Sequence, residues 1–382
     1  MIMAFAIVGL LAFAAFACDV GYILLSRAQL QNSADASAMA GAWALMHEDR
    51  LKGDQAMWAV ENAAREEAYN YAFANKVASD HPEVDLNGGN APTGDVVFGR
   101  LNADGSLDTL VSPEEYNAVH VIVERSEDKN GEVSLFFGRV LGRGQAAVRA
   151  EATASFRDGI TGFKSNSQHP FTSLLPFAMD VDDWRALYGG NGADDWTYDD
   201  ETGKVVSGDD GVQEAKLFPE KTNGNHITPG NFGTVDIGHS GNSTADLARQ
   251  ILEGVSAADL DYIGGELNIG DTISGDGIQS VDGQDGLILN GDTGLSAGIK
   301  DELTAIIGQP RTIPLYDAVQ GAGNTTNYHI VGFAGIRIVD VRLTGSKKYI
   351  TIQPAVVVDG SGVGGDGTSS SYQIYAPVFL VN

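Results

Sequence analysis

The sequence predicts an α+β protein: a long apolar N-terminal helix, a second helix with a small antiparallel sheet, and a mostly β domain rich in Gly and Asp. Three observations lead to this prediction. Residues 1–18 contain no charged side chain. Residues 26–46 contain no Pro and are rich in Ala, Gln and Leu, which favour helix. The chain has 48 Gly against 11 Pro, which is typical of turn-rich β structure with long surface loops.

The N-terminal segment decides the cellular compartment. It is apolar through Cys18, and the first basic residue is Arg27. About 20 apolar residues are enough to cross a bilayer as a helix. Three interpretations compete: a signal peptide cleaved after Ala15-Phe16-Ala17, a lipoprotein with Cys18 as lipid acceptor, and a retained helix. We favour the retained helix, because no basic residue precedes the apolar run.

Asp19 interrupts the apolar run, which resumes from Val20 to Leu25. One interpretation is a functional charge inside the membrane. The other is the membrane boundary, since 18 helical residues rise roughly 27 Å, close to one hydrocarbon thickness. We favour the boundary.

Helical periodicity continues beyond the apolar run, so that one helix is expected over residues 1–46. Ile23, Leu30, Ala34, Ala38 and Leu45 recur at helical spacing. This stripe of small residues predicts either a surface for self-association or packing against the next helix of the same chain. The residues expected to mediate assembly are Ile7, Leu10, Leu11, Phe13, Phe16, Asp19, Leu30, Ala34 and Ala38.

A small α+β module is expected over residues 47–157. Asp54 is the predicted N-cap of a second helix over 54–79, which His81-Pro82 ends. Alternation or β-branched content predicts four strands, and Asn130-Gly131 predicts a tight hairpin. The predicted strands are 95–101, 118–125, 133–139 and 146–156.

The rest of the chain is predicted as a linker over 158–170 and a mostly β, acidic domain over 171–382. Cap residues predict short helices, at 244–253, from Ser256 onward, and at 296–307 with Gly308 as C-cap. Strands are predicted at 328–341, 349–358 and 372–381. The last strand either completes a sheet in its own chain or adds to a sheet of a neighbour, and the first is the commoner arrangement.

Two segments resemble the TadE/TadG-like pilus-assembly family. The first is DVGYILLSRAQLQNSADASAMAGA (Asp19–Ala42), and the second is VHVIVERSEDKNGEVSLFFGRVLGRGQAAVRAEATASF (Val119–Phe156). The positions that match the family's N-terminal pattern are Asp19, Gly21, Gln31, Ala34, Asp35, Ala38, Ala40, Gly41 and Ala42. The chain departs from pilin-type subunits at position 5, where Phe5 replaces their usual Glu. The resemblance implies an inner-membrane helix, a body outside the cytoplasm, and Tad-type secretion and assembly machinery as a partner.

Charge restricts the remaining partners. The chain has 24 Lys and Arg against 51 Asp and Glu, a formal net charge of −27. This field repels phosphate backbones, so that we expect no nucleic-acid partner. It also disfavours anionic membrane surfaces, so that membrane contact is expected through apolar insertion. The single cysteine excludes an intramolecular disulfide.

The sequence gives little indication of catalysis. Gly203-Lys204 lacks P-loop spacing, and no HExxH or GxSxG is present. We therefore expect no enzyme. Two acidic clusters predict either Ca²⁺ sites or turns that keep an exposed protein soluble, and the second interpretation is favoured. The candidate ligands are Asp194, Asp195, Asp199, Asp200, Asp209, Asp210, Asp276, Asp282 and Asp285.

The hypothesis from these observations is a pilus-like subunit or pilus-assembly component of the bacterial cell envelope. It would be inserted in the inner membrane through its N-terminal helix, or assembled through that helix with copies of itself, and then exposed in the periplasm or on the cell surface. The alternative is a membrane-tethered extracellular protein whose 171–382 domain binds a ligand with Ca²⁺ or hydrolyses it.

Overall fold

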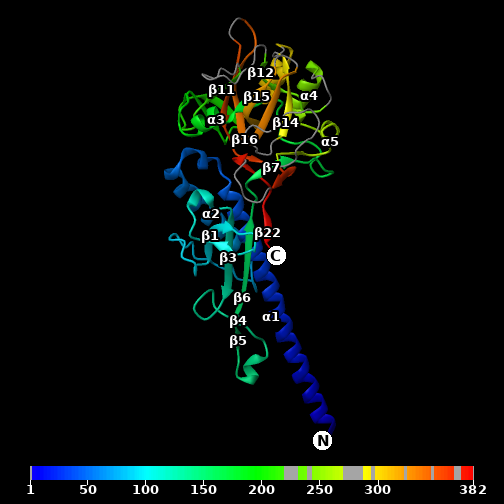
Figure 1. Ribbon diagram of the computed structural model, residues 1–382. Coiled ribbons are helices and arrows are strands. Elements are labelled where there is room, and N and C mark those ends of the chain that lie inside the picture. The colour runs from blue at the N-terminus through cyan, green and yellow to red at the C-terminus, as the bar shows by residue number, and fades with distance from the viewer. Residues whose placement is uncertain are drawn as a thin grey trace. The chain divides into compact units, whose positions relative to one another are not determined.

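The computed structural model describes residues 2–218, 231–238, 243–269, 287–293, 297–321, 325–345, 348–364 and 371–381 (Figure 1). The fold is α+β, as the sequence predicts. The chain forms two compact units. Unit 1 contains residues 1–156 and 378–382, and unit 2 contains residues 157–377.

Two helices dominate unit 1. Helix α1 (Ile2–Leu45) is continuous over 44 residues, which confirms the predicted long helix. A 3-10 turn, η1 (Glu48–Lys52), connects it to α2 (Asp54–Ala74). The two helices pack against each other, and α1 also packs on strands of the unit 1 sheet.

Helix α2 is shorter than the predicted range of 54–79. Its C-cap is Asn75, whose side-chain amide donates to the carbonyl of Tyr71 at 2.7 Å. Beyond it, Ala78 and Ser79 adopt φ angles of 51° and 77°, which a right-handed helix does not allow. At the other end Gly53, and not Asp54, is the N-cap.

The sheet of unit 1 is antiparallel and has five strands in the order β2-β1-β3-β6-β22. The strands are β1 (Val96–Leu101), β2 (Leu107–Asp108), β3 (Ala118–Arg125), β6 (Val148–Ser155) and β22 (Phe379–Val381). In β3 and β6, Val and Ala alternate with polar residues, which buries one face of each strand. A short 3-10 helix, η2 (Pro113–Glu115), precedes β3.

The predicted hairpin at Asn130-Gly131 is wrong, because strand β3 pairs with β1 and β6 and not with the segment that follows this turn. Asn130 and Gly131 do adopt left-handed φ angles of 58° and 67°. They lead into β4 (Val133–Ser134), which pairs with β5 (Gln145–Ala146). The predicted strand 133–139 therefore ends at Ser134 and is followed by a 3-10 helix, η3 (Gly138–Leu141).

The C-terminal strand returns to unit 1. Strand β22 pairs with β6, with Phe379 opposite Ser155 and Val381 opposite Thr153. The last strand thus completes a sheet of its own chain, the favoured alternative. It also means that a division at 171–382 does not follow the compact units. In addition, the predicted linker 158–170 contains β7 (Ile160–Phe163), which is hydrogen-bonded to two strands of unit 2.

Unit 2 is mostly β. Its main sheet is built around β16 (Asn327–Arg342), which forms a long hairpin with β15 (Pro310–Gln320). The other strands of this sheet are β8 (Met179–Asp180), β11 (Ala215–Phe218), β12 (Asn231–Val235), β14 (Leu287–Thr293), β17 (Tyr349–Pro354) and β20 (Ser371–Tyr372). Smaller sheets contain β7, β9 (Trp196–Asp199), β10 (Lys204–Ser207), β13 (Leu267–Asn268), β18 (Val357–Val358), β19 (Gly362–Gly364) and β21 (Ile374–Tyr375).

Short helices cover the hydrophobic core of unit 2. They are α3 (Val181–Tyr188), α4 (Thr244–Glu253), α5 (Ala257–Asp261), η5 (Ala297–Ile299) and α6 (Lys300–Ala305). Two predicted N-terminal caps are confirmed: Ser243 caps α4, and Ser256 with Asp259 forms a capping box on α5. The predicted C-cap Gly308 is wrong, because α6 ends at Ala305 and its C-cap is Ile306. Trp184 of α3 is fully buried in a hydrophobic core cluster of unit 2.

Candidate assembly interface

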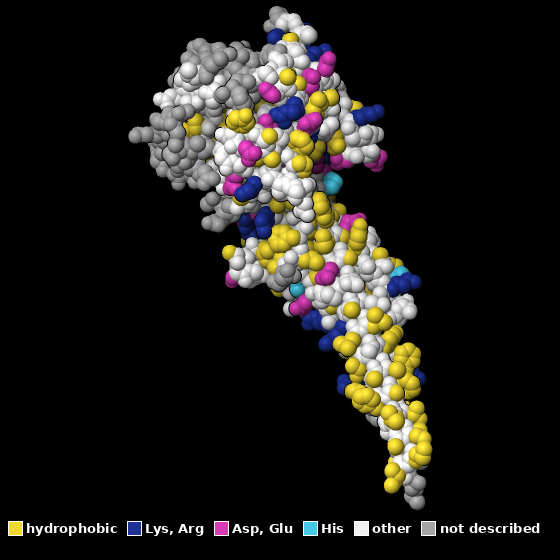
Figure 2. Space-filling view, turned by 90° about the vertical axis from the view of Figure 1, so that its right-hand side faces the viewer, with side chains coloured by type: hydrophobic (Ala, Val, Ile, Leu, Met, Phe, Trp, Pro, Cys, Tyr) yellow, Lys and Arg dark blue, Asp and Glu magenta, His cyan; other side chains and the backbone are white. Residues whose placement is uncertain are grey.

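The N-terminal part of α1 presents large apolar side chains to its surroundings. Ile2 is 88% exposed and Leu10 is 69% exposed. Figure 2 shows hydrophobic side chains covering this part of the helix. The other exposed large apolar residues here are Met3, Phe5, Ile7, Val8, Leu11, Phe13, Phe16, Val20, Leu24 and Leu25. Five predicted assembly residues, Ile7, Leu10, Leu11, Phe13 and Phe16, belong to this exposed set.

The exposed part of α1 is apolar on every side. At about 100° per residue, Phe5, Ile7, Val8, Leu10 and Leu11 lie at roughly 0°, 200°, 300°, 140° and 240° around the helix axis. A surface helix that packs on one partner has a single apolar stripe, whereas a helix that is apolar all round is enclosed by apolar material. Helix α1 is long and apolar enough to cross a membrane. By composition, this part of α1 thus resembles helices that lipid or other helices enclose.

The C-terminal half of α1 has a different environment, because one face lies in the core of unit 1. Leu30, Ala34 and Ala38 are fully buried, and so are Ala64 and Ala68 of α2. Small residues on both helices let the backbones approach closely. Of the two alternatives for the small-residue stripe, the structure shows packing within the chain. Leu30, Ala34 and Ala38 are thus core residues and present no surface to another copy.

Polar groups also connect this half of α1 to its own unit. The hydroxyl of Ser33 donates to the carbonyl of Ala72 at 3.1 Å, and Ser37 donates to the carbonyl of Ala68. The side-chain amide of Gln31 donates to Asp35 at 2.8 Å and to the backbone carbonyl of Glu151 on β6 at 3.0 Å. These bonds add directional contacts to the apolar packing.

Gly41 lies where α1 packs tightly against α2 and β3. A Cβ atom at this position would meet the Val119 side chain at 3.2 Å and the Ala64 carbonyl oxygen at 3.3 Å. A larger residue would therefore push α1 away from α2 and from β3. Gln31, Ala34, Asp35, Ala38 and Gly41, which carry the family resemblance, thus act together in packing or fixing α1 on unit 1.

Asp19 is buried, with an exposed fraction of 5%. Its Oδ1 accepts the backbone N–H of Phe136 at 2.8 Å, and its two carboxylate oxygens accept the N–H of Phe137 at 3.1 and 3.2 Å. The residue predicted as a membrane boundary is thus the point at which α1 binds the segment between β4 and η3. These bonds satisfy the Asp19 carboxylate where the strongly exposed part of α1 meets the segment that follows β4.

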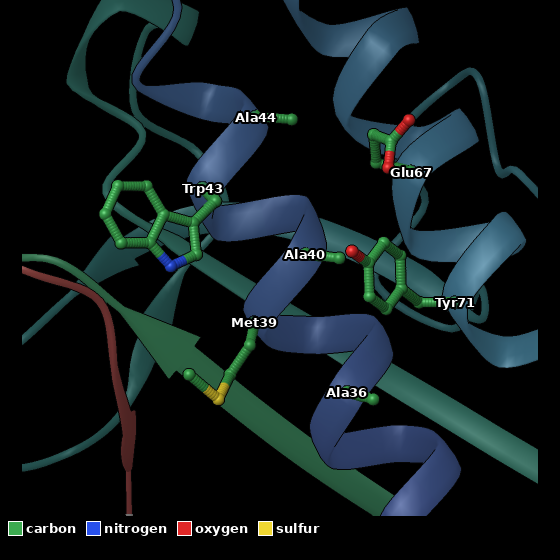
Figure 3. A pocket seen from close by; sticks show the side chains of 7 residues that line it. All are labelled: Ala36, Met39, Ala40, Trp43, Ala44, Glu67 and Tyr71. Carbon is green, nitrogen blue, oxygen red and sulfur yellow. The ribbon is translucent and has the colours of Figure 1, made fainter. Parts of the chain in front are cut away.

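A shallow groove of about 570 Å³ lies on the outer face of the two helices (Figure 3). Ala36, Ala40 and Ala44 of α1 point toward α2, from which Glu67 and Tyr71 point back. Met39 and Trp43 point to the other side of α1. The alanines make this groove wide and apolar.

The first acidic cluster is engaged in turns. Asp194 accepts the N–H groups of Asp210 and Gly211 at 3.0 and 3.1 Å, and Asp199 accepts those of Glu201 and Thr202 at 2.9 and 3.1 Å. Asp195, Asp200 and Asp209 are exposed. Within the described residues, no three acidic, His or Cys side chains converge in a way that could hold a metal ion. The cluster that contains Asp276, Asp282 and Asp285 lies outside the described residues.

Sequence reasoning did not identify Glu214 of this region. It is 3% exposed, and its two carboxylate oxygens accept the N–H groups of Asp195 and Trp196 at 2.8 and 3.2 Å. Burial, helped by the nearby charges of Asp194 and Asp210 and opposed by the two backbone N–H groups, raises the pKa of Glu214 to about 7. The residue joins the β9–β10 hairpin to β11.

Sequence reasoning also missed the role of the segment that follows β4. The sequence predicts Phe136 and Phe137 in a strand, yet the side chains of both are exposed and their backbone N–H groups donate to Asp19. The available signal was the pair of glycines, Gly138 and Gly142, inside an apolar run, because glycines at this spacing favour a turn over a strand.

Two known protein families match the part of the chain that contains these features. Residues 1–44 match the family described as Flp pilus-assembly TadE/G-like, and residues 40–154 match the family described as Tad-like Flp pilus-assembly. The two matches together span residues 1–154, which lie within unit 1. No curated protein and no solved structure matches the chain.

Proposed function

We propose that the chain is a non-enzymatic component of a Tad-type pilus-assembly system, held in the envelope membrane by the exposed part of α1, since residues 1–44 match the TadE/G-like family and residues 40–154 match the Tad-like Flp pilus-assembly family. The observation that carries this proposal is the contrast between the two halves of α1. The large apolar side chains among residues 2–18 face all sides and are exposed, whereas Leu30, Ala34 and Ala38 are buried against α2 and the sheet. The helix thus joins a membrane segment rigidly to a folded body.

Energetics support membrane insertion of the exposed half. Burial of apolar surface is favourable by about 25 cal/mol per Å² removed from water. Phe5, Leu10 and Phe13 are each largely exposed in the isolated chain and gain this free energy on entering lipid. The rest of the chain, including the acidic unit 2, then lies outside the hydrocarbon layer, and we place it on the non-cytoplasmic side.

The test uses two charges in the middle of the exposed half. The variant Leu10→Arg with Leu11→Arg places two guanidinium groups in the hydrocarbon layer, at about 3 kcal/mol each on insertion scales. We expect a loss of the full-length chain from carbonate-washed membranes. The matched control is Leu110→Arg, at a position in unit 1 that is 93% exposed. Retention of the double variant in membranes at the level of the parent chain would overturn the proposal.

A second candidate is a filament subunit whose α1 helices bundle with those of other copies. The all-round apolar surface favours it equally, and a Cβ atom built on Gly9 would meet no atom within 4 Å, so that this face of α1 is open to another helix. Electron microscopy of the native protein distinguishes the two. Filaments with α1 along their axis support the subunit, and dispersed detergent-bound particles support the anchored assembly component.

A further inference from the structure

The segment between β4 and β5, residues 135–144, is an ordered loop, and we call it the β4–β5 loop. The N–H of Leu135 donates to the carbonyl of Gly144 at 2.8 Å, and the N–H of Arg143 donates to that of Gly138 at 2.9 Å. Gly142 caps η3 at a φ angle of 83°. A Cβ atom on Gly138 would lie 2.2 Å from the carbonyl oxygen of Arg143, so that only glycine fits there. The loop therefore holds a defined shape.

This shape turns apolar side chains outward. Phe136 is 67% exposed, Val140 is 87% exposed, and Phe137 is also exposed. Arg139 and Arg143 are exposed beside them. The ten residues of the loop contain two Arg and no Asp or Glu, in a chain whose formal net charge is −27. The loop thus combines an apolar tip with local positive charge, unlike the acidic chain as a whole.

The loop is attached to α1 where the exposed apolar half of the helix begins. Asp19 accepts the N–H groups of Phe136 and Phe137, and the ring of Tyr22 contacts that of Phe136 edge-on at 5.2 Å between centroids. Figure 1 shows the β4–β5 hairpin reaching along α1 toward the N-terminus. The apolar surface of the loop is therefore continuous with that of the helix.

We propose that the β4–β5 loop docks into the headgroup region of the same bilayer that receives α1, and that it selects anionic lipids. This inference rests on the proposed membrane anchoring. Residues 2–18 of α1 rise roughly 25 Å, close to the hydrocarbon thickness, so that Asp19 and the loop lie at the interface. Phe137 and Val140 face the acyl chains there, as aromatic and apolar side chains do at membrane interfaces. Arg139 and Arg143 extend to lipid phosphates.

Lipid is a better occupant for this loop than a protein groove. The apolar side chains of the tip are strongly exposed, and the loop is attached to a helix whose neighbouring half is itself apolar on every side. Paired Arg side chains fit the phosphate groups of anionic lipids, to which Arg can donate two hydrogen bonds at once. The net negative charge of the chain repels anionic membrane surfaces. The loop, which carries two Arg and no acidic residue, is therefore the part of the folded body that contacts such a membrane.

The experiment uses the full chain with Cys18→Ser, so that a single introduced cysteine carries an environment-sensitive fluorophore. The label is placed at Val140→Cys, at Leu10→Cys or at Leu110→Cys, and each protein is reconstituted in vesicles of phosphatidylcholine with phosphatidylglycerol. Quenchers attached near the headgroup or deep in the acyl chain report the depth of each label. Leu110 precedes Glu114, whose carbonyl oxygen accepts an N–H of Arg50 beyond the far end of α1, so that this position serves as the aqueous control.

We expect deep quenching at position 10, shallow quenching at position 140 and none at position 110. Replacing Arg139→Gln or Arg143→Gln should lower the docked fraction in anionic vesicles about fivefold per charge, and should change it little in pure phosphatidylcholine.

Three outcomes would contradict the docking proposal, the membrane anchoring, or the assignment of the bilayer as the surface that covers the loop. A label at position 140 that is as aqueous as the one at 110, while position 10 is quenched, overturns the docking proposal and leaves the anchoring intact. No quenching at position 10 overturns the anchoring itself. Protection at position 140 that disappears when the protein is diluted in lipid shows that a second copy, and not the bilayer, covers the loop.

Discussion

The carboxylate of Asp19 accepts the backbone N–H of Phe136 at 2.8 Å, across 117 residues of sequence. A carboxylate that accepts backbone N–H groups makes charge-assisted bonds, which are stronger than neutral ones. This pair joins the β4–β5 loop to α1 at the end of the exposed apolar part of the helix. It therefore fixes the height of the loop along the helix.

Replacing Asp19→Ala should release this loop. The N–H groups of Phe136 and Phe137 would lose their acceptor, at a cost of about 1–3 kcal/mol per lost charged hydrogen bond. We expect faster hydrogen exchange in peptides that contain residues 135–144, with little change in α2. The matched control is Asp19→Asn, which keeps one acceptor oxygen and should show an intermediate rate. Equal exchange in all three proteins would show that the bond does not hold the loop.

The buried stripe on α1 should tolerate no added volume. Ala38→Leu inserts three carbon atoms between α1 and its neighbours, and we expect unit 1 to lose about 1–3 kcal/mol of its free energy of unfolding. Ala28, which is exposed on the same helix, provides the control Ala28→Leu. Urea unfolding followed by helix circular dichroism measures both. If Ala38→Leu left stability unchanged but altered the oligomeric state, the stripe would be an association surface after all.

Local patterns in the sequence predicted the elements of unit 1 better than their pairing. The alternation in 118–125 predicts β3 to the residue, and the helical periodicity that continues beyond the apolar run predicts the end of α1 to within one residue. The partner of β3 was not predictable from local patterns. Asn130-Gly131 indicates a hairpin with the segment that follows directly, whereas β3 pairs with β6, which is more distant in sequence. Burial of Val119, Val121 and Val123 under α1 favours this non-local pairing.

In the candidate site, too, local composition was predictable from the sequence, whereas contacts between distant segments were not. Apolar residues 2–18 were recognisable from composition alone. The role of Leu30, Ala34 and Ala38 was not, because a stripe of small residues has the same pattern whether a helix of the same chain or of another copy covers it. The contact of Asp19 with Phe136 depends on the shape of a loop more than 100 residues away in sequence, which no local pattern records.

Removing the C-terminal strand should weaken unit 1, although unit 2 precedes it in sequence. Deletion from Val378 onward leaves the edge of β6 unpaired at Thr153 and Ser155. The lost ladder bonds cost about 1 kcal/mol each, and an open sheet edge favours aggregation. We expect earlier urea unfolding of unit 1, measured by pulsed hydrogen exchange of β3 and β6 peptides, with unit 2 unchanged.

The control for this deletion is Leu380→Thr, which keeps the backbone ladder and should cost less than the deletion. Unchanged protection of β6 in the shortened chain would contradict the assignment of β22 to unit 1.

Glu214 should make the stability of unit 2 depend on pH. Burial raises its pKa from the ordinary 4.5 to about 7 in the folded chain. Between these two values the folded state holds a proton that the unfolded state has released, so that the free energy of unfolding falls as pH rises. The contribution is complete below pH 4.5 and is lost through pH 7. At 1.36 kcal/mol per pKa unit, it amounts to at most roughly 3 kcal/mol.

The measurement compares urea unfolding of the parent chain with that of Glu214→Gln at pH 5, 6.5 and 8, followed by hydrogen exchange of peptides from β9 to β11. The stability of the parent relative to the variant should fall across this range, because Gln does not titrate. Glu201→Gln, at an exposed position of the same hairpin, should show no such trend. A difference between parent and Glu214→Gln that stayed constant with pH would show that the Glu214 carboxyl does not titrate between these values. The two N–H groups that it accepts would then hold the carboxylate ionised against the effect of burial.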